Sequence, residues 1–136
     1  MTATSIFLVS ACLLGLKTRY DGQCKVSKEC LEMTRGSYIV PVCPEQLGGL
    51  TTPREAADIV NGDGVDVLEG RAKVINRSGD DVTSHFVQGA YQVLKIADIQ
   101  NISAVCLKSR SPSCGVKRLG VTGALLKKHG YILHEF

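Results

Sequence analysis

Short apolar runs rich in β-branched residues recur along the chain and predict the strands of a sheet. The first covers residues 5–10 and reads SIFLVS. Four further runs cover residues 38–42, 72–76, 102–107 and 131–134. Because apolar runs without polar alternation are typical of strands covered on both faces, we expect a buried, mainly parallel sheet.

Helical periodicity is clearest after Asp81. Apolar residues follow it at spacings of four, four, four and three, which places them on one face of a helix: Val82, Phe86, Ala90, Leu94 and Ala97. A shorter helix is expected over residues 121–128, because Gly130 supplies a stop signal just after it. The segment around Cys24 and Cys30 is also expected to be helical.

Residues 52–55 have the form of a helix start. Thr52 could act as the N-cap, Pro53 would occupy the first helical position, and Glu55 could reach back to the N-cap amide. We therefore expect a helix to begin at Thr52.

Strands that alternate with helices predict an α/β fold. We expect residues 1–136 to form a single domain, a three-layer sandwich with a mainly parallel, Rossmann-like sheet. A composition of 44% hydrophobic and 21% charged residues fits a globular chain rather than a disordered one. The net charge of +3 is too small to indicate a nucleic-acid groove by itself.

The six cysteines are informative because of where they occur. The sequence preceding Cys12 is similar to a lipoprotein signal, but residues 2–16 contain no Lys or Arg and the apolar run is short. No stretch approaches the roughly 20 apolar residues of a membrane span. We expect a cytoplasmic protein with reduced cysteines, for which metal binding or catalysis is a better hypothesis than disulfides. The absence of any C-x-x-C pair excludes a zinc ribbon or a thioredoxin-like motif.

Three of the cysteines follow predicted strands. Cys12, Cys43 and Cys114 come after the first, second and fourth strands, and in parallel α/β sheets these loops meet at one edge. Cys106 lies within a predicted strand, and Cys24 and Cys30 lie in a predicted helical segment, where a buried thiol commonly acts as a small apolar side chain. The loop trio is therefore the candidate metal site.

The same loops carry other reactive side chains. Glu45 lies two residues after Cys43, where its carboxylate could act as a general acid or base. The basic residues near Cys114 are expected to lower thiol pKa values and to offset the charge of a thiolate-bound cluster: Lys108, Arg110, Lys117 and Arg118. Tyr20 and Asp21 form either a turn or a substrate contact.

Three thiolates at one point repel one another, and a metal centre would resolve this. Zinc could bind three Cys and a water, although its sites are often built with His or with pairs close in sequence. A cubane iron-sulfur cluster with three protein ligands would leave one iron open as a Lewis acid. The residues alone favour the cluster without excluding zinc.

These segments together resemble the DUF523 or thiouracil desulfidase (TudS-like) family, nearly from end to end. The motifs that carry the resemblance are residues 9–15, 19–22, 41–45, 47–49, 52–54, 81–83, 108–115, 120–122 and 124–126. The segment 115–120 is shorter than in many members, which bears on the substrate more than on the cluster.

The resemblance implies a 4Fe-4S cluster with three cysteine ligands, Cys12, Cys43 and Cys114, and one open iron. The implied reaction is a non-redox removal of sulfur from 2- or 4-thiouracil or a related nucleobase, giving uracil and hydrogen sulfide. Glu45 would move protons, and Ser111 is a candidate for a second proton-handling or orienting group. The candidate substrate contacts are Tyr20, Asp21, Lys108 and Arg110.

Two alternatives remain at this point. An iron-sulfur sensor or sulfur-binding module would bind the cluster without turnover. A nucleotide-binding α/β domain is supported by the fold class alone, because the chain has neither a G-x-G-x-x-G motif nor a P-loop. The expected partner is a small thiolated base, with nucleic acid entering only as thiolated RNA, and the sequence does not indicate an oligomeric state.

Overall fold

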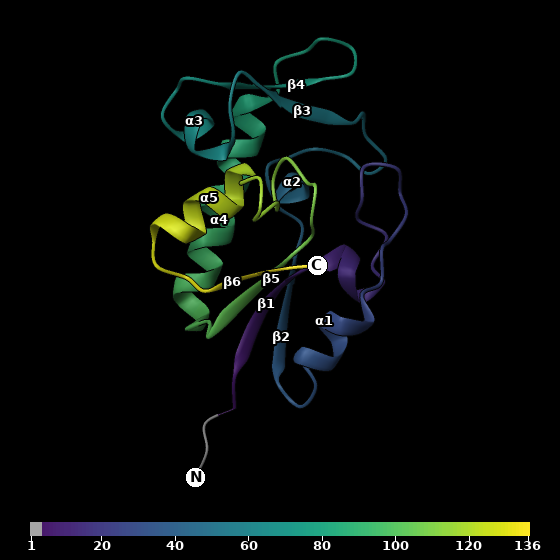
Figure 1. Cartoon of the computed structure of the whole chain (residues 1–136). Helices are drawn as coiled ribbons and strands as arrows, with labels where there is room; N and C mark the ends of the chain where they lie inside the picture. Colours follow the sequence, from purple (N-terminus) through teal and green to yellow (C-terminus); the bar gives the residue numbers. More distant parts are fainter. Residues whose placement is uncertain (1–3) are drawn as a thin grey trace.

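The computed structural model describes residues 4–136 and contains a four-stranded parallel sheet of order β2-β1-β5-β6. The strands are β1 (Ile6–Ser10), β2 (Tyr38–Val42), β5 (Ala104–Leu107) and β6 (Leu133–Glu135). Figure 1 shows them running side by side through the centre of the molecule. The predicted α/β class and parallel sheet are confirmed.

Successive side chains of the central strands enter two different cores, as the alternation of a strand requires. Leu8 and Val105 pack with α4 (Thr83–Gln100) and α5 (Val121–Lys128). Their neighbours Val9 and Cys106 pack instead with the 3-10 helix η1 (Ala11–Leu14) and with α1 (Lys28–Met33). Helices therefore cover both faces of the sheet (Figure 1), and the expected three layers are present.

The periodicity after Asp81 predicted α4 correctly. Phe86, Ala90, Leu94 and Ala97 are buried along one face, and the helix ends at Asn101, whose φ of 53° lies in the left-handed region. The shorter helix expected over residues 121–128 is α5. These are the two elements in which apolar spacing and burial agree most closely.

A small antiparallel hairpin lies outside the main sheet. It consists of β3 (Ala57–Val60) and β4 (Lys73–Asn76), with α3 (Gly64–Leu68) between them in the chain. The run at 72–76 was correctly predicted to be a strand, but it pairs with β3 rather than with the parallel sheet. In Figure 1 the hairpin crosses the end of the molecule where α2 (Pro44–Leu47) lies.

The helix expected to start at Thr52 is absent, because residues 51–56 form an irregular segment leading into β3. The Thr52 hydroxyl accepts hydrogen bonds from Gln46 Nε2 at 2.7 Å and Arg54 Nη1 at 2.8 Å instead of from a helix amide. Glu55 accepts a hydrogen bond from the Ser78 hydroxyl. Both side chains of the supposed capping box are thus used in tertiary contacts.

Two smaller differences concern the ends of elements. Cys30 lies in α1 as expected, whereas Cys24 lies in the irregular segment that precedes this helix. The last strand covers Leu133–Glu135 rather than residues 131–134. A capping box does occur, but at the start of α3, where Asp63 and Asp66 each bind the other's backbone amide.

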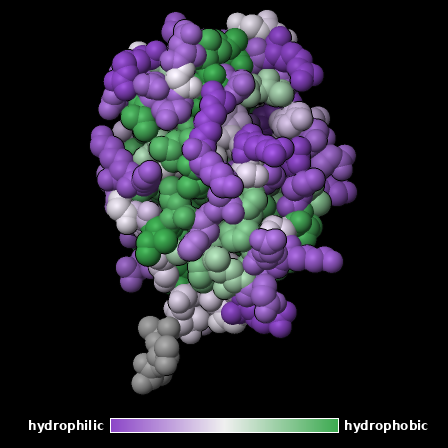
Figure 2. All heavy atoms as spheres, in the orientation of Figure 1, coloured by the Kyte–Doolittle hydropathy of each residue, from purple (hydrophilic) through white to green (hydrophobic). Residues whose placement is uncertain are grey.

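Hydrophilic side chains cover much of the face shown in Figure 2, and the apolar groups on it are scattered between them. Within the described residues, no helix combines the length and the hydropathy that a membrane crossing requires.

Candidate active site

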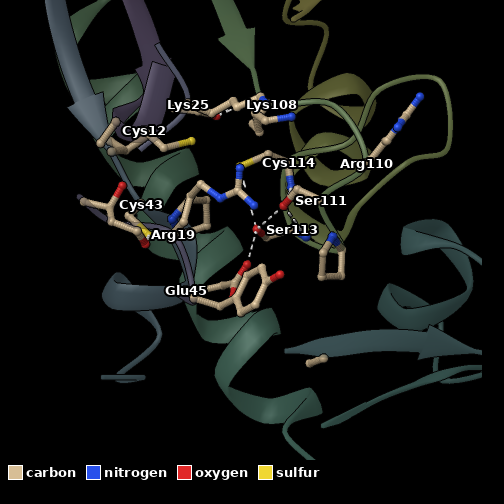
Figure 3. A pocket seen from close by; sticks show the side chains of 18 of the residues that line it. Cys12, Arg19, Lys25, Cys43, Glu45, Lys108, Arg110, Ser111, Ser113 and Cys114 are labelled. Atoms are coloured by element: carbon tan, nitrogen blue, oxygen red, sulfur yellow. Dashed lines mark hydrogen bonds between the residues drawn. The ribbon is translucent and has the colours of Figure 1, made fainter. Parts of the chain in front are cut away.

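Cys12, Cys43 and Cys114 line one cavity of about 380 Å³ (Figure 3). Cys12 lies in η1 directly after β1, Cys43 caps α2 directly after β2, and Cys114 lies in the loop after β5. Because β2, β1 and β5 are neighbours in one parallel sheet, their carboxyl ends meet at the same edge. The structure therefore brings together the trio that the sequence singled out.

The donor set of this cavity suits an iron-sulfur cluster better than a single metal ion. No three His, Cys, Asp or Glu side chains in residues 4–136 are close enough together to hold one ion. A cubane does not require such convergence, because each thiolate binds a different iron. Among the described residues, the lining of the cavity includes no fourth Cys and no His. The side chains of the cavity therefore offer three thiolate ligands.

Burial dominates the acidity of these thiols. It raises the pKa of Cys114 to about 12, and hydrogen bonds from Ser10 and Ser113 only partly oppose it. Burial also raises the pKa of Cys12, although Lys108 acts in the opposite direction. Nearby cations act to lower the pKa of Cys12, as expected, but desolvation of the thiolate outweighs their attraction, so the pKa values of both thiols are raised overall. Binding a metal must therefore displace protons from both thiols.

Glu45 lies in the first turn of α2 and faces the same cavity as the thiols (Figure 3). Its Oε1 atom forms an ion pair with Arg54 Nε at 2.9 Å, and both side chains are nearly buried. Its Oε2 atom accepts a hydrogen bond from the Ser113 hydroxyl at 3.0 Å. Both carboxylate oxygens are thus oriented by side chains from other segments.

Ser111 and Ser113 form a short chain of hydroxyls that ends at Glu45. Their Oγ atoms lie 3.0 Å apart, and Ser111 Oγ also accepts hydrogen bonds from the amides of Ser113 and Cys114. Ser111 therefore reaches the carboxylate through Ser113 and holds the backbone of the Cys114 loop. Ser113 was not among the predicted site residues, although its place directly before Cys114 was a signal that could have identified it.

Cations surround the other side of the cavity. Arg19, Lys25, Lys108 and Arg110 line it together with Tyr20 (Figure 3 labels the four cations). Burial lowers the pKa of Lys108, and the neighbouring cations lower it further. Lys108 Nζ donates hydrogen bonds to the Ser109 carbonyl and hydroxyl oxygens, at 3.0 Å and 3.1 Å. This rim favours an anionic group in the cavity.

Asp21 is not part of the cavity lining. Its carboxylate accepts a hydrogen bond from the Gln23 amide at 3.0 Å and forms an ion pair with Arg19 at 3.6 Å. Gly22, with a φ of 75°, completes a turn at this position. The geometry at Asp21 is that of the turn, with an indirect link to the cavity through Arg19.

A larger groove of about 1020 Å³ adjoins the cavity and shares the loop at residues 109–112 with it. Arg77, Arg110, Lys117 and Arg118 line this groove. Lys117 and Arg118, which were expected to lie near the thiols, line the groove and not the cavity.

The remaining cysteines lie elsewhere. Cys30 in α1 and Cys106 in β5 are fully buried in one core cluster, and Cys24 is half-buried. Burial raises the pKa of Cys106 to about 12 and also raises that of Cys30. This agrees with the expectation that Cys30 and Cys106 act as core residues.

Comparisons with known proteins identify the family of this chain. The profile of the family described as 2-thiouracil desulfurase matches residues 7–134. An uncharacterized protein, YbbK, of Bacillus subtilis (strain 168) is 43% identical over 139 residues, covering 93% of this chain and 92% of YbbK. A solved structure described as the [4Fe-4S]-dependent thiouracil desulfidase TudS superposes with a TM-score of 0.81 at 36% identity, covering 98% of this chain and 91% of the solved one. The chain therefore belongs to the 2-thiouracil desulfurase family.

Proposed function

We propose that this protein is a desulfidase that replaces the sulfur of a thiolated uracil with oxygen, using a 4Fe-4S cluster held by Cys12, Cys43 and Cys114. In the overall reaction, thiouracil and water give uracil and hydrogen sulfide, so no electron donor or acceptor is needed. The observation that carries the proposal is one cavity lined by three thiols and an oriented carboxylate.

The three thiols account for the ligand set. Each comes from the end of a different strand, and together they line a cavity of about 380 Å³. When bound, a cluster with three protein ligands supplies an open, Lewis-acidic iron to which the sulfur of a thiocarbonyl can bind.

Glu45 is the residue placed to move protons in this cavity. Its carboxylate can accept a proton from the attacking water and return it to the departing sulfur or to the ring. The Ser113 hydroxyl orients Oε2 of that carboxylate, and Ser111 follows Ser113 in the chain of hydrogen bonds. Ser111 thus acts by holding the Cys114 loop and by supporting the Ser113 hydroxyl.

The cationic rim is suited to an anionic ligand or product. Lys108 and Arg110 can attract the ionised base and stabilise hydrosulfide before it leaves, while Tyr20 offers a ring and a hydroxyl at the cavity wall. Asp21 orients Arg19 rather than contacting the substrate directly. Six free cysteines and an oxygen-sensitive cluster fit a reducing, cytoplasmic compartment.

Anaerobic reconstitution with iron and sulfide tests the proposal. We expect bound iron, visible absorption of the cluster, and release of sulfide and uracil from 2- or 4-thiouracil. Cys43→Ser should lose iron and activity together. Glu45→Gln should keep its iron and lose about 10²- to 10⁴-fold in kcat, the usual contribution of a general acid or base.

Cys24→Ser is the matched control, because Cys24 lies outside the cavity and should be replaceable without loss of iron or turnover. Full activity in both the Cys43 and the Glu45 variants, or an iron-free protein with full activity, would overturn the mechanism. A stable cluster without sulfide release would favour the sensor. Parallel assays with the free base and with thiouridine-containing RNA identify the form of the substrate.

A further inference from the structure

The guanidinium of Arg54 lies between the Cys43 sulfur and the Glu45 carboxylate. Nε donates to Glu45 Oε1 at 2.9 Å, while Nη2 donates to the Thr18 carbonyl at 2.9 Å and to Cys43 Sγ at 3.8 Å. Nη1 donates to the Thr51 carbonyl at 3.1 Å and to the Thr52 hydroxyl at 2.8 Å. Five hydrogen bonds therefore fix this side chain, which is only 7% exposed.

A buried cation of this kind is costly unless its charge and donors are satisfied. Arg54 meets that condition by joining segments that are distant in the sequence, with Thr18 in one and Glu45 in another. A lysine could supply the charge, but a single ammonium cannot direct donors to the carboxylate and to the sulfur in fixed directions. The planar fork of Arg54 is thus matched to two different groups at once.

The hydrogen bonding of Cys43 changes when its thiol loses a proton to bind iron. As a thiol, Cys43 donates its hydrogen to the Thr18 carbonyl, with Sγ and O 3.6 Å apart. A thiolate has no hydrogen to donate and can only accept hydrogen bonds. Arg54 Nη2 is a donor already placed beside that sulfur and already held by the same Thr18 carbonyl.

We propose that Arg54 is a positioning residue that fixes the Glu45 carboxylate toward the cavity and stabilises the Cys43 thiolate as a cluster ligand. The inference rests on the proposed function. Hydrogen bonds and positive charge at a ligand sulfur withdraw electron density from a cluster and raise its reduction potential. Arg54 therefore acts on two properties, the cluster potential and the catalytic turnover, through two separate hydrogen bonds.

The test compares Arg54→Gln and Arg54→Lys in anaerobically reconstituted protein. Arg54→Gln should retain iron but show a more negative reduction potential in an EPR-monitored titration, because the variant lacks both the positive charge and the hydrogen-bond donor to the Cys43 sulfur. Its kcat should fall about 10- to 100-fold, the usual effect of residues that support metal ligands, with little change in KM. Arg54→Lys should move the potential back toward the wild-type value while kcat stays low.

Arg71→Gln is the control, since Arg71 also pairs with two carboxylates, Asp66 and Glu69, but on the exposed surface outside the cavity. It should leave both the potential and kcat unchanged. Wild-type potential and kcat in Arg54→Gln would overturn the inference, as would loss of iron and of thermal stability in both Arg54 variants, which would indicate a purely structural role. The potential measurement needs no substrate, so a wild-type protein that holds a cluster without releasing sulfide contradicts the proposed function and leaves this test intact.

Discussion

Two buried thiols outside the cavity show how strongly burial acts on single residues of this chain. Cys106 in β5 and Cys30 in α1 are both fully buried, and Cys106 Sγ lies 3.9 Å from Met33 Sδ. Desolvation, together with the neighbouring Cys30, raises the pKa of Cys106 to about 12. Ionising either thiol in the native state would place a charge in an apolar core, so the native protein keeps both protonated.

This predicts that stability falls in alkaline solution. The unfolded chain releases the Cys106 proton near pH 9.0, whereas the native state keeps it until pH reaches about 12. Between these values the unfolded state binds fewer protons, so the free energy of unfolding decreases as pH rises. Urea unfolding at pH 8 and pH 10.5 should therefore show a larger loss for wild type than for Cys106→Ala, by up to about 2 kcal/mol.

The comparison must be made at equal iron content, because the cluster ligands also release protons when they bind metal. Cys24→Ala is the control, since Cys24 is half-buried, and it should keep the wild-type dependence on pH. Parallel curves for wild type and Cys106→Ala would show that Cys106 does not ionise on unfolding in this range.

At the level of single residues, the sequence pointed to the cysteines that line the cavity, but not to the side chains that orient Glu45. Cys12, Cys43 and Cys114 could be selected because strand ends converge in a parallel sheet. Ser113 and Arg54 act through hydrogen bonds to Glu45. Ser113 is 68 residues from Glu45 along the chain, and Arg54 is nine residues from it. Such pairings depend on side-chain directions in three dimensions, and spacing along the chain does not encode them.

At the scale of elements, the position of Glu45 depends on how closely α2 approaches α4. Gly48, just after α2, lies against the backbone of His85, and Gly89 in α4 lies against the carbonyl of Pro44. A Cβ atom at either glycine would overlap with the facing backbone. The close crossing of these helices therefore sets the depth at which α2 presents its carboxylate.

Gly89→Ala is expected to destabilise the protein, although alanine normally stabilises a helix by about 1 kcal/mol relative to glycine. The overlap with Pro44 should reverse that sign and cost about 1–3 kcal/mol, as overpacking does. It should also lower turnover by displacing Glu45. Urea unfolding and sulfide release measure the two effects, with Gln92→Ala on the exposed face of α4 as control. A more stable Gly89→Ala protein would show that the helices separate without cost.

The predicted elements differ in how far local signals determined them. The spacing after Asp81 predicted α4 because burial of one helical face follows directly from that period. Residues 52–55 were wrongly interpreted as a helix start, since Thr52 and Glu55 bind Gln46, Arg54 and Ser78 instead. A cap motif is made of the same polar groups that form tertiary hydrogen bonds, and the sequence alone does not distinguish the two uses.

Across the whole molecule, the short segment at residues 115–120 connects the parallel sheet to the hairpin. Arg118 donates hydrogen bonds to the carbonyls of Ile59 and Gly62, each at 3.2 Å, and the Leu119 carbonyl accepts from the Gly64 amide at 2.7 Å. On its other side, Glu135 at the end of β6 accepts from the amides of Val116 and Lys117. The loop that carries Cys114 is thus attached to both substructures.

Glu135 should therefore stabilise the fold and retain the cluster, although it does not line the cysteine cavity. Burial acts to raise its pKa, but hydrogen bonds from the Lys117 and Val116 amides outweigh this and lower it. Its contribution to stability is consequently complete above the ordinary pKa of 4.5 and is lost as pH falls through the lower native pKa.

Glu135→Ala leaves two amides without their acceptor and should cost about 1–3 kcal/mol at pH 7, with faster loss of iron. Glu135→Gln keeps an acceptor oxygen, so it should remain closer to wild type at pH 7 and lack the Glu135 part of the stability change below pH 4.5. Equal stability and equal iron retention in wild type and Glu135→Ala would mean that the hairpin contacts alone hold the Cys114 loop in place.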